Sequence, residues 1–310
     1  MAGAKNHDYH ILPPDPWPLI SSFSALAMAS GAIMWMHGAH KGAESANGGG
    51  WLFLAGFAAV LFSMYCWWRN VIKEGNQGDH TPVVQLHFRY GMILFIASEV
   101  MFFVGWFWAF FDFSLFPTAM SFVDGQVERA AEGAAAIAAQ WPPKGLEVIN
   151  AFELPLLNTL ILLTSGTTAT WAHHALIHNQ RGGEKAGLWG MLGVGNRDGV
   201  LKGLWLTVVL GVLFSAIQAY EYMHAPFPFK GINYGAAFFM ATGFHGFHVL
   251  IGTIFLIVCL VRAYGGAFTP RQHFGFEAAA WYWHFVDVVW LFLFVSVYVW
   301  GGWGAPVHGG

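Results

Sequence analysis

The sequence has little charge. Only 10% of its 310 residues are Asp, Glu, Lys or Arg, while 56% are hydrophobic; soluble domains carry about 25% charged residues. So few charges cannot cover a soluble protein of this length, which excludes an ordinary cytosolic domain and a disordered chain. The net charge of −3 offers phosphate no basic face, which excludes a nucleic-acid-binding protein. The two cysteines, Cys66 and Cys259, lie in apolar runs and provide neither a disulfide framework nor a thiolate metal site.

Long apolar segments are what the sequence has instead. A membrane-spanning helix needs about 20 mostly apolar residues. Seven segments with at most one charge meet this requirement, at 16–40, 45–68, 90–111, 154–180, 203–220, 231–261 and 278–310. The sequence therefore predicts an all-α integral membrane protein with seven transmembrane helices.

The Lys and Arg residues predict the orientation of these spans. Inner loops of membrane proteins carry an excess of both residues. With the N-terminus inside, ten of the 14 fall in inner segments and four in outer segments. We therefore expect a cytoplasmic N-terminus and an external C-terminus. In the longest connection, the Ala-rich stretch 127–140 predicts a short surface helix.

Glu99 is the first functional candidate, because an ionisable residue within a membrane span usually has a role. It lies midway through the third predicted span. A carboxylate there is costly, so the group needs a proton, a partner or water. Two interpretations stay open: a proton relay or lipid-headgroup contact, and a protonated acid that hydrogen-bonds to a neighbouring helix.

Two pairs of polar residues lie three positions apart within the spans, and each pair therefore shares a helix face. One pair is His245 and His248, and the other is His284 and Asp287. Haem or copper ligation by the first pair and a proton relay through the second are the functional interpretations. Structural contacts between helices are favoured for both pairs, because neighbouring helices can satisfy such groups.

Further polar residues lie near the ends of the predicted spans. His174 and His178 have the i, i+4 spacing of paired zinc ligands, but no third ligand accompanies them. Glu221 is expected to be an interfacial polar residue. Trp67 and Arg69 have the composition of an interfacial belt, and Arg69 is a candidate contact for a lipid phosphate.

Several stretches resemble a known family. They read FGFEAAAWYWHFVDVVWLF at 274–292, ATGFHGFHV at 241–249 with IGT at 251–253, RYGMILFIASEV at 89–100, LPLLNT at 154–159, TWAHH at 170–174, YH at 9–10 and PWPL at 16–19. Together they extend from residue 9 to about residue 303 and are similar to the cytochrome c oxidase subunit III family.

The resemblance implies a fold and a role. The fold has two N-terminal helices (1–68) separated from a five-helix bundle (69–310) by a V-shaped cleft that holds phospholipid. The role is that of subunit III of an aa3-type cytochrome c oxidase, which binds no haem, copper or other metal and has no catalytic site of its own. It stabilises the catalytic subunit I and supports proton uptake during the reduction of oxygen to water. Further partners are subunit II and membrane phospholipids, and a small subunit IV is left open.

The resemblance also implies positions for lipid and cleft contacts. The family's mid-membrane glutamate corresponds to Glu99, and lipid-phosphate contacts correspond to Arg69, His80, Arg89 and Arg262. The polar residues of the spans then become buried structural residues: His245, His248, His284, Asp287 and Glu221.

The long loops of this chain, at 120–140 and 181–200, favour a protein of the bacterial inner membrane over an organelle-encoded one. Two alternative functions stay open. One is the third subunit of a quinol oxidase, but such subunits typically lack the first two spans. The other is a proton-coupled membrane transporter that uses Glu99 and Asp287.

Overall fold

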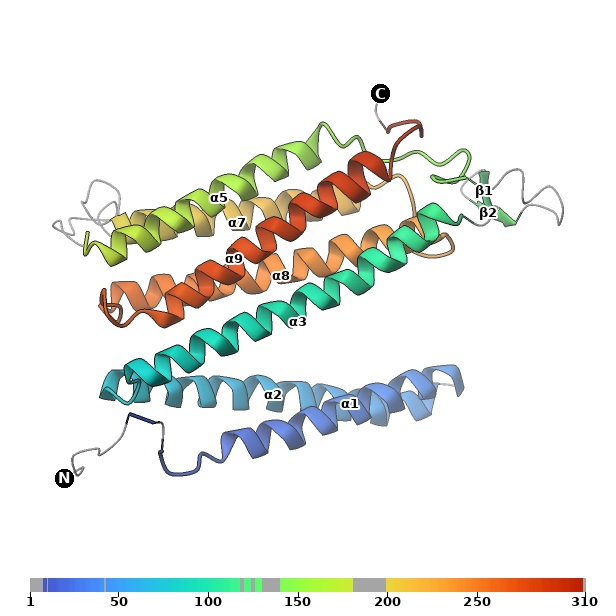
Figure 1. Cartoon of the computed structure of the whole chain (residues 1–310). Coiled ribbons are helices and arrows are strands. Elements are labelled where there is room, and N and C mark those ends of the chain that lie inside the picture. The colour runs from blue at the N-terminus through green and yellow to red at the C-terminus, as the bar shows by residue number, and fades with distance from the viewer. Residues whose placement is uncertain are drawn as a thin grey trace. The chain divides into compact units, whose positions relative to one another are not determined.

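Most of the described residues fold into helices. The computed structural model describes residues 8–9, 11–41, 43–117, 120–123, 126–129, 140–180 and 199–308, and these contain seven α-helices. They are α1 (Trp17–Lys41), α2 (Ala43–Gln77), α3 (Pro82–Leu115), α5 (Leu154–Ile177), α7 (Gly199–Met223), α8 (Asn233–Tyr264) and α9 (Phe274–Leu293), as Figure 1 shows. A π-helix, η1 (Phe294–Trp300), continues α9. The predicted helical membrane fold is confirmed.

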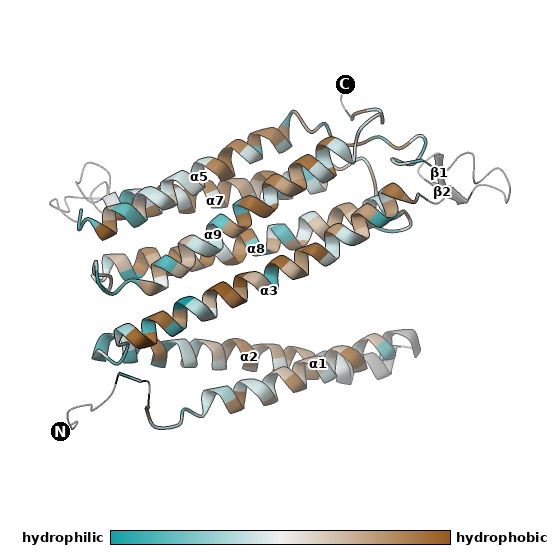
Figure 2. Ribbon diagram, in the orientation of Figure 1, coloured by the Kyte–Doolittle hydropathy of each residue, from teal (hydrophilic) through white to brown (hydrophobic). Residues whose placement is uncertain are grey.

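Six of the described helical segments are long and apolar enough to cross a membrane. They are Trp17–Gly38, Gly48–Gln77, Pro82–Leu115, Gly199–Met223, Asn233–Tyr264 and Phe274–Trp300. Figure 2 shows hydrophobic residues along these helices, with hydrophilic residues mostly at helix ends and at a few turns. The fourth predicted span forms α5, which is not among the six. Its sequence is rich in Thr and His, and both lower the mean hydropathy.

The described residues form two compact units, Met1–Phe88 and Arg89–Gly310. The division after residue 68 that the family resemblance implies stays a prediction. That position lies inside α2, which continues to Gln77. Charges at this end do not stop the helix, because long basic side chains can reach the polar interface from a membrane helix.

In the first unit, α1 and α2 form an antiparallel hairpin that depends on glycine. A Cβ on Gly31 would lie 2.3 Å from the backbone nitrogen of Phe53, and one on Gly56 would lie 2.4 Å from that of Met28. Small residues of this kind let membrane helices approach closely. Farther along the hairpin, the hydroxyl of Ser21 donates to Ser63 Oγ at 3.0 Å.

In the second unit, α5, α7, α8 and α9 lie side by side (Figure 1). Trp283 and Trp290 of α9 are fully buried, and each has a hydrogen-bond acceptor on α5. The indole N–H of Trp283 donates to Ser165 Oγ, and that of Trp290 donates to Thr159 Oγ1, each at 2.9 Å. The polar residues of α5 therefore serve the core of the bundle.

The C-terminal part of α3 packs against α9 through aromatic rings. The ring centroids of Phe107 and Phe292 lie 4.7 Å apart, and those of Phe103 and Phe285 lie 6.0 Å apart. Edge-to-face and tilted geometries of this kind are favourable for aromatic pairs.

A short antiparallel hairpin follows α3. It consists of β1 (Met120–Val123) and β2 (Gln126–Arg129), with Phe122 opposite Val127. The predicted surface helix over 127–140 is therefore wrong at its start, because residues 127–129 belong to β2. Residues 130–139 lie outside the described part of the chain.

The C-terminal tail lies against the connection that precedes α5. The N–H of Val148 donates to the carbonyl of Pro306, and the N–H of His308 donates to the carbonyl of Val148, each at 2.9 Å. The exposed side chains of Glu147 and His308 also form an ion pair at 2.9 Å.

Candidate functional site

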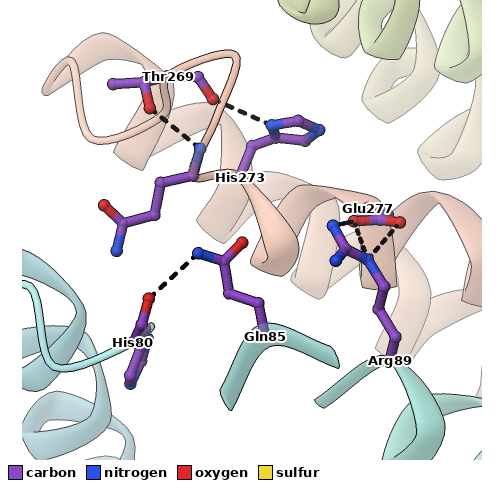
Figure 3. A network of polar contacts seen from close by, with 7 residues as sticks. His80, Gln85, Arg89, Thr269, His273 and Glu277 are labelled. Atoms are coloured by element: carbon purple, nitrogen blue, oxygen red, sulfur yellow. Dashed lines mark hydrogen bonds and ion pairs between the residues drawn. The ribbon is translucent and has the colours of Figure 1, made fainter. Parts of the chain in front are cut away.

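Arg89 is held by a carboxylate of its own chain. Its Nε lies 3.0 and 3.1 Å from the two carboxylate oxygens of Glu277, and its Nη2 lies 2.8 Å from Oε2 (Figure 3). The guanidinium and carboxylate planes thus meet as two forks, a geometry that is stronger than a single-point ion pair. The pair joins α3 to the first turn of α9. The predicted lipid contact of Arg89 stays a prediction, and it would have to use the remaining donors of the guanidinium.

Glu99 pairs with His248 of α8. Its Oε2 lies 2.8 Å from His248 Nε2, and His248 Nδ1 lies 2.6 Å from the carbonyl oxygen of Phe244. A carbonyl can only accept, so Nδ1 carries a hydrogen. The Nε2 contact is then either a bond from a protonated Glu99 to a neutral imidazole or an ion pair. In both cases a partner compensates the carboxyl group at membrane depth, which fits a contact between helices.

His245 is completely buried in α8. Its Nε2 lies 3.1 Å from the carbonyl oxygen of Val286 in α9 and must donate to it, which fixes the tautomer. Its Nδ1 is buried with no hydrogen-bond partner among the described residues. Although they share a helix face in the sequence, His245 and His248 thus have separate partners.

His284 and Asp287 both lie against α5. His284 Nε2 is 3.1 Å from the hydroxyl oxygen of Thr170. The Asp287 carboxyl occupies space that Gly166 leaves open, because a Cβ on Gly166 would lie 2.1 Å from Asp287 Oδ2. Asp287 is 6% exposed, and its Oδ1 has no hydrogen-bond partner among the described residues. The shared face is therefore a contact face between two helices.

Glu221 is buried, with 3% of its surface exposed. Its Oε1 accepts from the Tyr298 hydroxyl at 2.6 Å and from the Gln218 amide at 3.1 Å. The Gln218 oxygen in turn accepts from Asn158 Nδ2 at 3.4 Å. We call Asn158, Gln218, Glu221 and Tyr298 the Glu221 cluster; it joins α5, α7 and η1.

Arg262, near the end of α8, lies over an aromatic ring. Its guanidinium carbon is 4.7 Å from the ring centroid of Phe268. Gly275 provides the room, since a Cβ there would lie 2.9 Å from Arg262 Nη1. The cation is partly exposed, so a cation–π contact holds it in place.

In the first unit, Arg69 lines a pocket of about 530 Å³ at the end of α2. Lys73 contributes a second cation, and Trp17 and Asn70 form part of the wall. Asp15 fixes this corner, because its carboxylate accepts from the Trp17 N–H at 3.1 Å and from Asn70 Nδ2 at 2.9 Å. Two cations beside an aromatic ring could hold an anionic group.

The two other first-unit candidates have different surroundings. Trp67 is 38% exposed and is not part of the pocket wall. His80 Nε2 lies 3.9 Å from Glu74 Oε2, and its ring meets the Phe88 ring edge-on at 4.9 Å. Its backbone carbonyl accepts from the Gln85 amide at 3.1 Å (Figure 3).

The two histidines with zinc-ligand spacing, His174 and His178, form a local contact. His178 Nδ1 lies 2.9 Å from the carbonyl oxygen of His174, so that nitrogen donates to its own helix. Within the described residues, no group of three or more His, Cys, Asp or Glu side chains is arranged to hold a metal ion.

Sequence reasoning missed three important residues: Glu277, Gly166 and Tyr298. Glu277 is a charged residue beside an apolar span and could have been paired with Arg89 on charge alone. Gly166 and Tyr298 carry no such signal, because only the packing of distant helices gives them a role.

Comparison with known proteins gives a consistent result. The family model for cytochrome c oxidase subunit III matches residues 7–302. Cytochrome c oxidase subunit 3 of Marchantia polymorpha is 50% identical, covering 97% of this chain and 100% of the relative. The protein of the same name from Arabidopsis thaliana is 48% identical, with the same coverage. That of Osphranter robustus is 47% identical, covering 96% of this chain and 98% of the relative.

Proposed function

This chain belongs to the cytochrome c oxidase subunit III family of terminal oxidase subunits, and on that premise we propose that it is the non-redox third subunit of an aa3-type enzyme. The family match over residues 7–302 carries the proposal. In the assembled oxidase the chain stabilises the catalytic subunit I, with subunit II as a further partner. Haem and copper belong to partner subunits, and this chain supports proton uptake during reduction of oxygen to water.

The histidine geometry supports a non-redox role. Both ring nitrogens of His248 are engaged, one by Phe244 and one by Glu99. His245 donates its Nε2 hydrogen to a backbone carbonyl. Imidazoles committed to such bonds hold helices together, and they would have to break these contacts to ligate haem or copper.

Phospholipid binding is the second part of the proposal. The pocket at Arg69 and Lys73 offers two cations to an anionic headgroup, and each can contribute about 1 kcal/mol near a membrane surface. Arg262 is a further candidate, because it has an aromatic contact but no carboxylate partner among its described contacts. The lipid-holding cleft that the family resemblance implies is part of the same proposal.

A seventh span is the third part. We propose that α5 crosses the membrane beside α7 and α9, although its composition is more polar. Its threonine hydroxyls bond within the helix: those of Thr164 and Thr170 donate to the carbonyls of Leu160 and Gly166. Hydroxyls satisfied in this way can be accommodated in a membrane helix. Seven spans would leave the two termini on opposite sides, and the excess of Lys and Arg in the inner segments favours a cytoplasmic N-terminus and an external C-terminus in a bacterial inner membrane.

Purification through a tag on this chain tests the function. The expected result is a detergent-solubilised complex with a haem spectrum and oxidase activity, whereas the chain alone shows neither. A tagged chain that purifies without haem-bearing partners and transports protons by itself would instead support the transporter alternative. Quinol oxidation by the purified complex would support the quinol oxidase alternative, although the described α1 and α2 oppose it.

A further inference from the structure

The Glu221 cluster is an isolated polar site inside the bundle. Asn158 is fully buried, and Gln218, Glu221 and Tyr298 are each 3% exposed. The four side chains come from three elements, α5, α7 and η1, and are linked in one chain of hydrogen bonds. The proposed function gives this site no role.

An inventory of donors and acceptors shows what the cluster lacks. The Tyr298 hydroxyl and the Gln218 amide both donate to Glu221 Oε1. The nitrogen of the Gln218 amide also lies 3.1 Å from Tyr298 Oη. The oxygen of that amide accepts from Asn158 Nδ2. Two buried acceptors remain without a partner among the described residues: Glu221 Oε2 and Asn158 Oδ1. The cluster is therefore short of a donor at two oxygen atoms.

The groups around Glu221 also provide no positive charge among the described residues. The titratable groups that act on it are phenols, Tyr298 of η1 and its neighbour Tyr222 on α7. On α5 the neutral Asn158 amide bonds to Gln218 of the same network, and on α8 the Thr242 hydroxyl accepts from Tyr222 at 2.8 Å. No cation acts on the carboxyl from the described residues. A buried carboxylate without a counter-charge is strongly disfavoured.

We propose that Glu221 is a proton-binding site, and that its carboxyl group is a neutral acid whose Oε2–H is shared with Asn158 Oδ1. One hydrogen supplies the missing donor for both unpartnered oxygens. Both side chains hydrogen-bond to Gln218, Asn158 to its amide oxygen and Glu221 to its amide nitrogen, so they belong to one network. The bound proton thereby joins α5 to α7, while the Tyr298 hydroxyl joins η1 to the same carboxyl group.

Infrared difference spectroscopy of the intact complex tests this assignment. Wild-type protein at neutral pH should show a protonated carboxyl C=O band that Glu221→Gln removes and Tyr298→Phe shifts, because the phenol donates to the same group. Glu153→Gln is the matched control, since this exposed carboxylate at the start of α5 should contribute only to the ionised band. If Glu221→Gln instead removes ionised carboxylate absorption, the proposal is wrong and the acceptors are satisfied by water.

Thermal unfolding of the same variants provides a second readout. Glu221→Gln should keep the wild-type midpoint, because its amide can donate to Asn158 Oδ1 and its oxygen can accept from Tyr298. Glu221→Ala should lower the midpoint. Wild type should lose stability as pH rises, because the unfolded carboxyl then gains by ionising, while the Gln variant should lack that dependence. Equal losses in the Gln and Ala variants would overturn the proposal, since they would mean that the negative charge is required.

Discussion

Gly166 decides whether Asp287 can lie against α5. The glycine has no side chain, and the carboxyl fills the space that a Cβ would take. A carboxyl at this depth can therefore be accommodated only because the facing helix has a glycine at this position. Two residues that are far apart in the sequence thus act as one structural unit.

Gly166→Ala should destabilise the protein by roughly 1–3 kcal/mol, because the new methyl group collides with Asp287. Gly243→Ala is the matched control: it lies in α8, and nothing is within 4 Å of its Cβ position. That substitution should be neutral or slightly stabilising, since alanine favours a helix. Thermal unfolding of the purified complex measures both, and equal midpoints would show that Asp287 does not need the space.

A second prediction at the residue scale concerns the ion pair between Arg89 and Glu277. Arg89→Ala and Glu277→Ala should each cost about 1–2 kcal/mol, since the hydrogen bonds involve charged groups but the guanidinium side is partly exposed. The double variant should cost less than the sum, with a coupling energy of about 0.5–3 kcal/mol. Arg89→Lys should recover only part of the loss, because lysine lacks the fork. Additive single effects in unfolding measurements would contradict a direct bond.

Among the helices, α5 shows that mean hydropathy can understate a membrane segment. Thr and His residues lower its average, yet its hydroxyls donate to its own carbonyls or accept from indoles of α9. These hydroxyls therefore have hydrogen-bond partners within the bundle, including Thr164 on the exposed side of α5.

Cysteine accessibility tests whether α5 crosses the membrane. In a variant without Cys66 and Cys259, single cysteines at Phe152 and His178 mark positions just outside the two ends of α5, and both are exposed. A membrane-impermeant thiol reagent added outside intact cells should label Phe152→Cys, and it should label His178→Cys only after the cells are opened. Labelling of both positions from the same side would show that α5 does not span.

A prediction at the scale of helices concerns the close packing of α1 against α2. Gly56→Ala should force α1 and α2 apart, because the added Cβ meets the backbone of Met28, which cannot move aside as a side chain could. A disulfide between Ser21→Cys and Ser63→Cys, whose hydroxyl oxygens lie 3.0 Å apart, reports on the separation. Gly48→Ala is the control in the same helix, with nothing within 4 Å of its Cβ position. Equal cross-linking yields in the two backgrounds would refute close glycine packing.

For the whole molecule, the proposed function predicts a change in lifetime. An oxidase complex without this subunit should begin turnover at nearly the normal rate and then inactivate after fewer turnovers. Without the subunit, subunit I loses packing and receives protons more slowly, so reactive oxygen intermediates persist longer. Counting turnovers before inactivation measures the effect. Arg69→Ala should give a milder decrease through weaker lipid binding. Equal lifetimes with and without the subunit, or immediate loss of all activity, would each contradict a supporting role.

The sequence predicts the helices of this molecule better than their contacts. Hydrophobic length located the seven α-helices of the described residues, because membrane burial acts on each segment separately. It placed their ends less well, since α3 begins at Pro82 whereas the predicted span starts at residue 90. Most residues between these positions are apolar, but Arg89 is charged, and the predicted span begins at the residue after it.

Partner choice could not be derived from spacing. Arg89 and Glu277 are 188 positions apart, and Glu99 and His248 are 149 apart. Periodicity relates residues on one helix face and does not say which face of another helix lies opposite. The hairpin after α3 had a local signal, Asp124-Gly125, which favours two-residue turns. The Ala-rich composition beside it concealed that signal.

The π-helix η1 makes the end of the last span tolerant of changes in chain length. A π-helix bonds each residue to the fifth one along, so a turn holds an extra residue compared with an α-helix. Loss of one residue within α9 would rotate everything beyond it by about 100° and turn buried groups outward. Loss of one residue from η1, for example the exposed Val295, would instead let the segment relax towards an ordinary α-helix. The buried face of the residues after η1 would then stay aligned with the buried face of α9. Single-residue insertions and deletions in evolution should therefore accumulate here and not in α9.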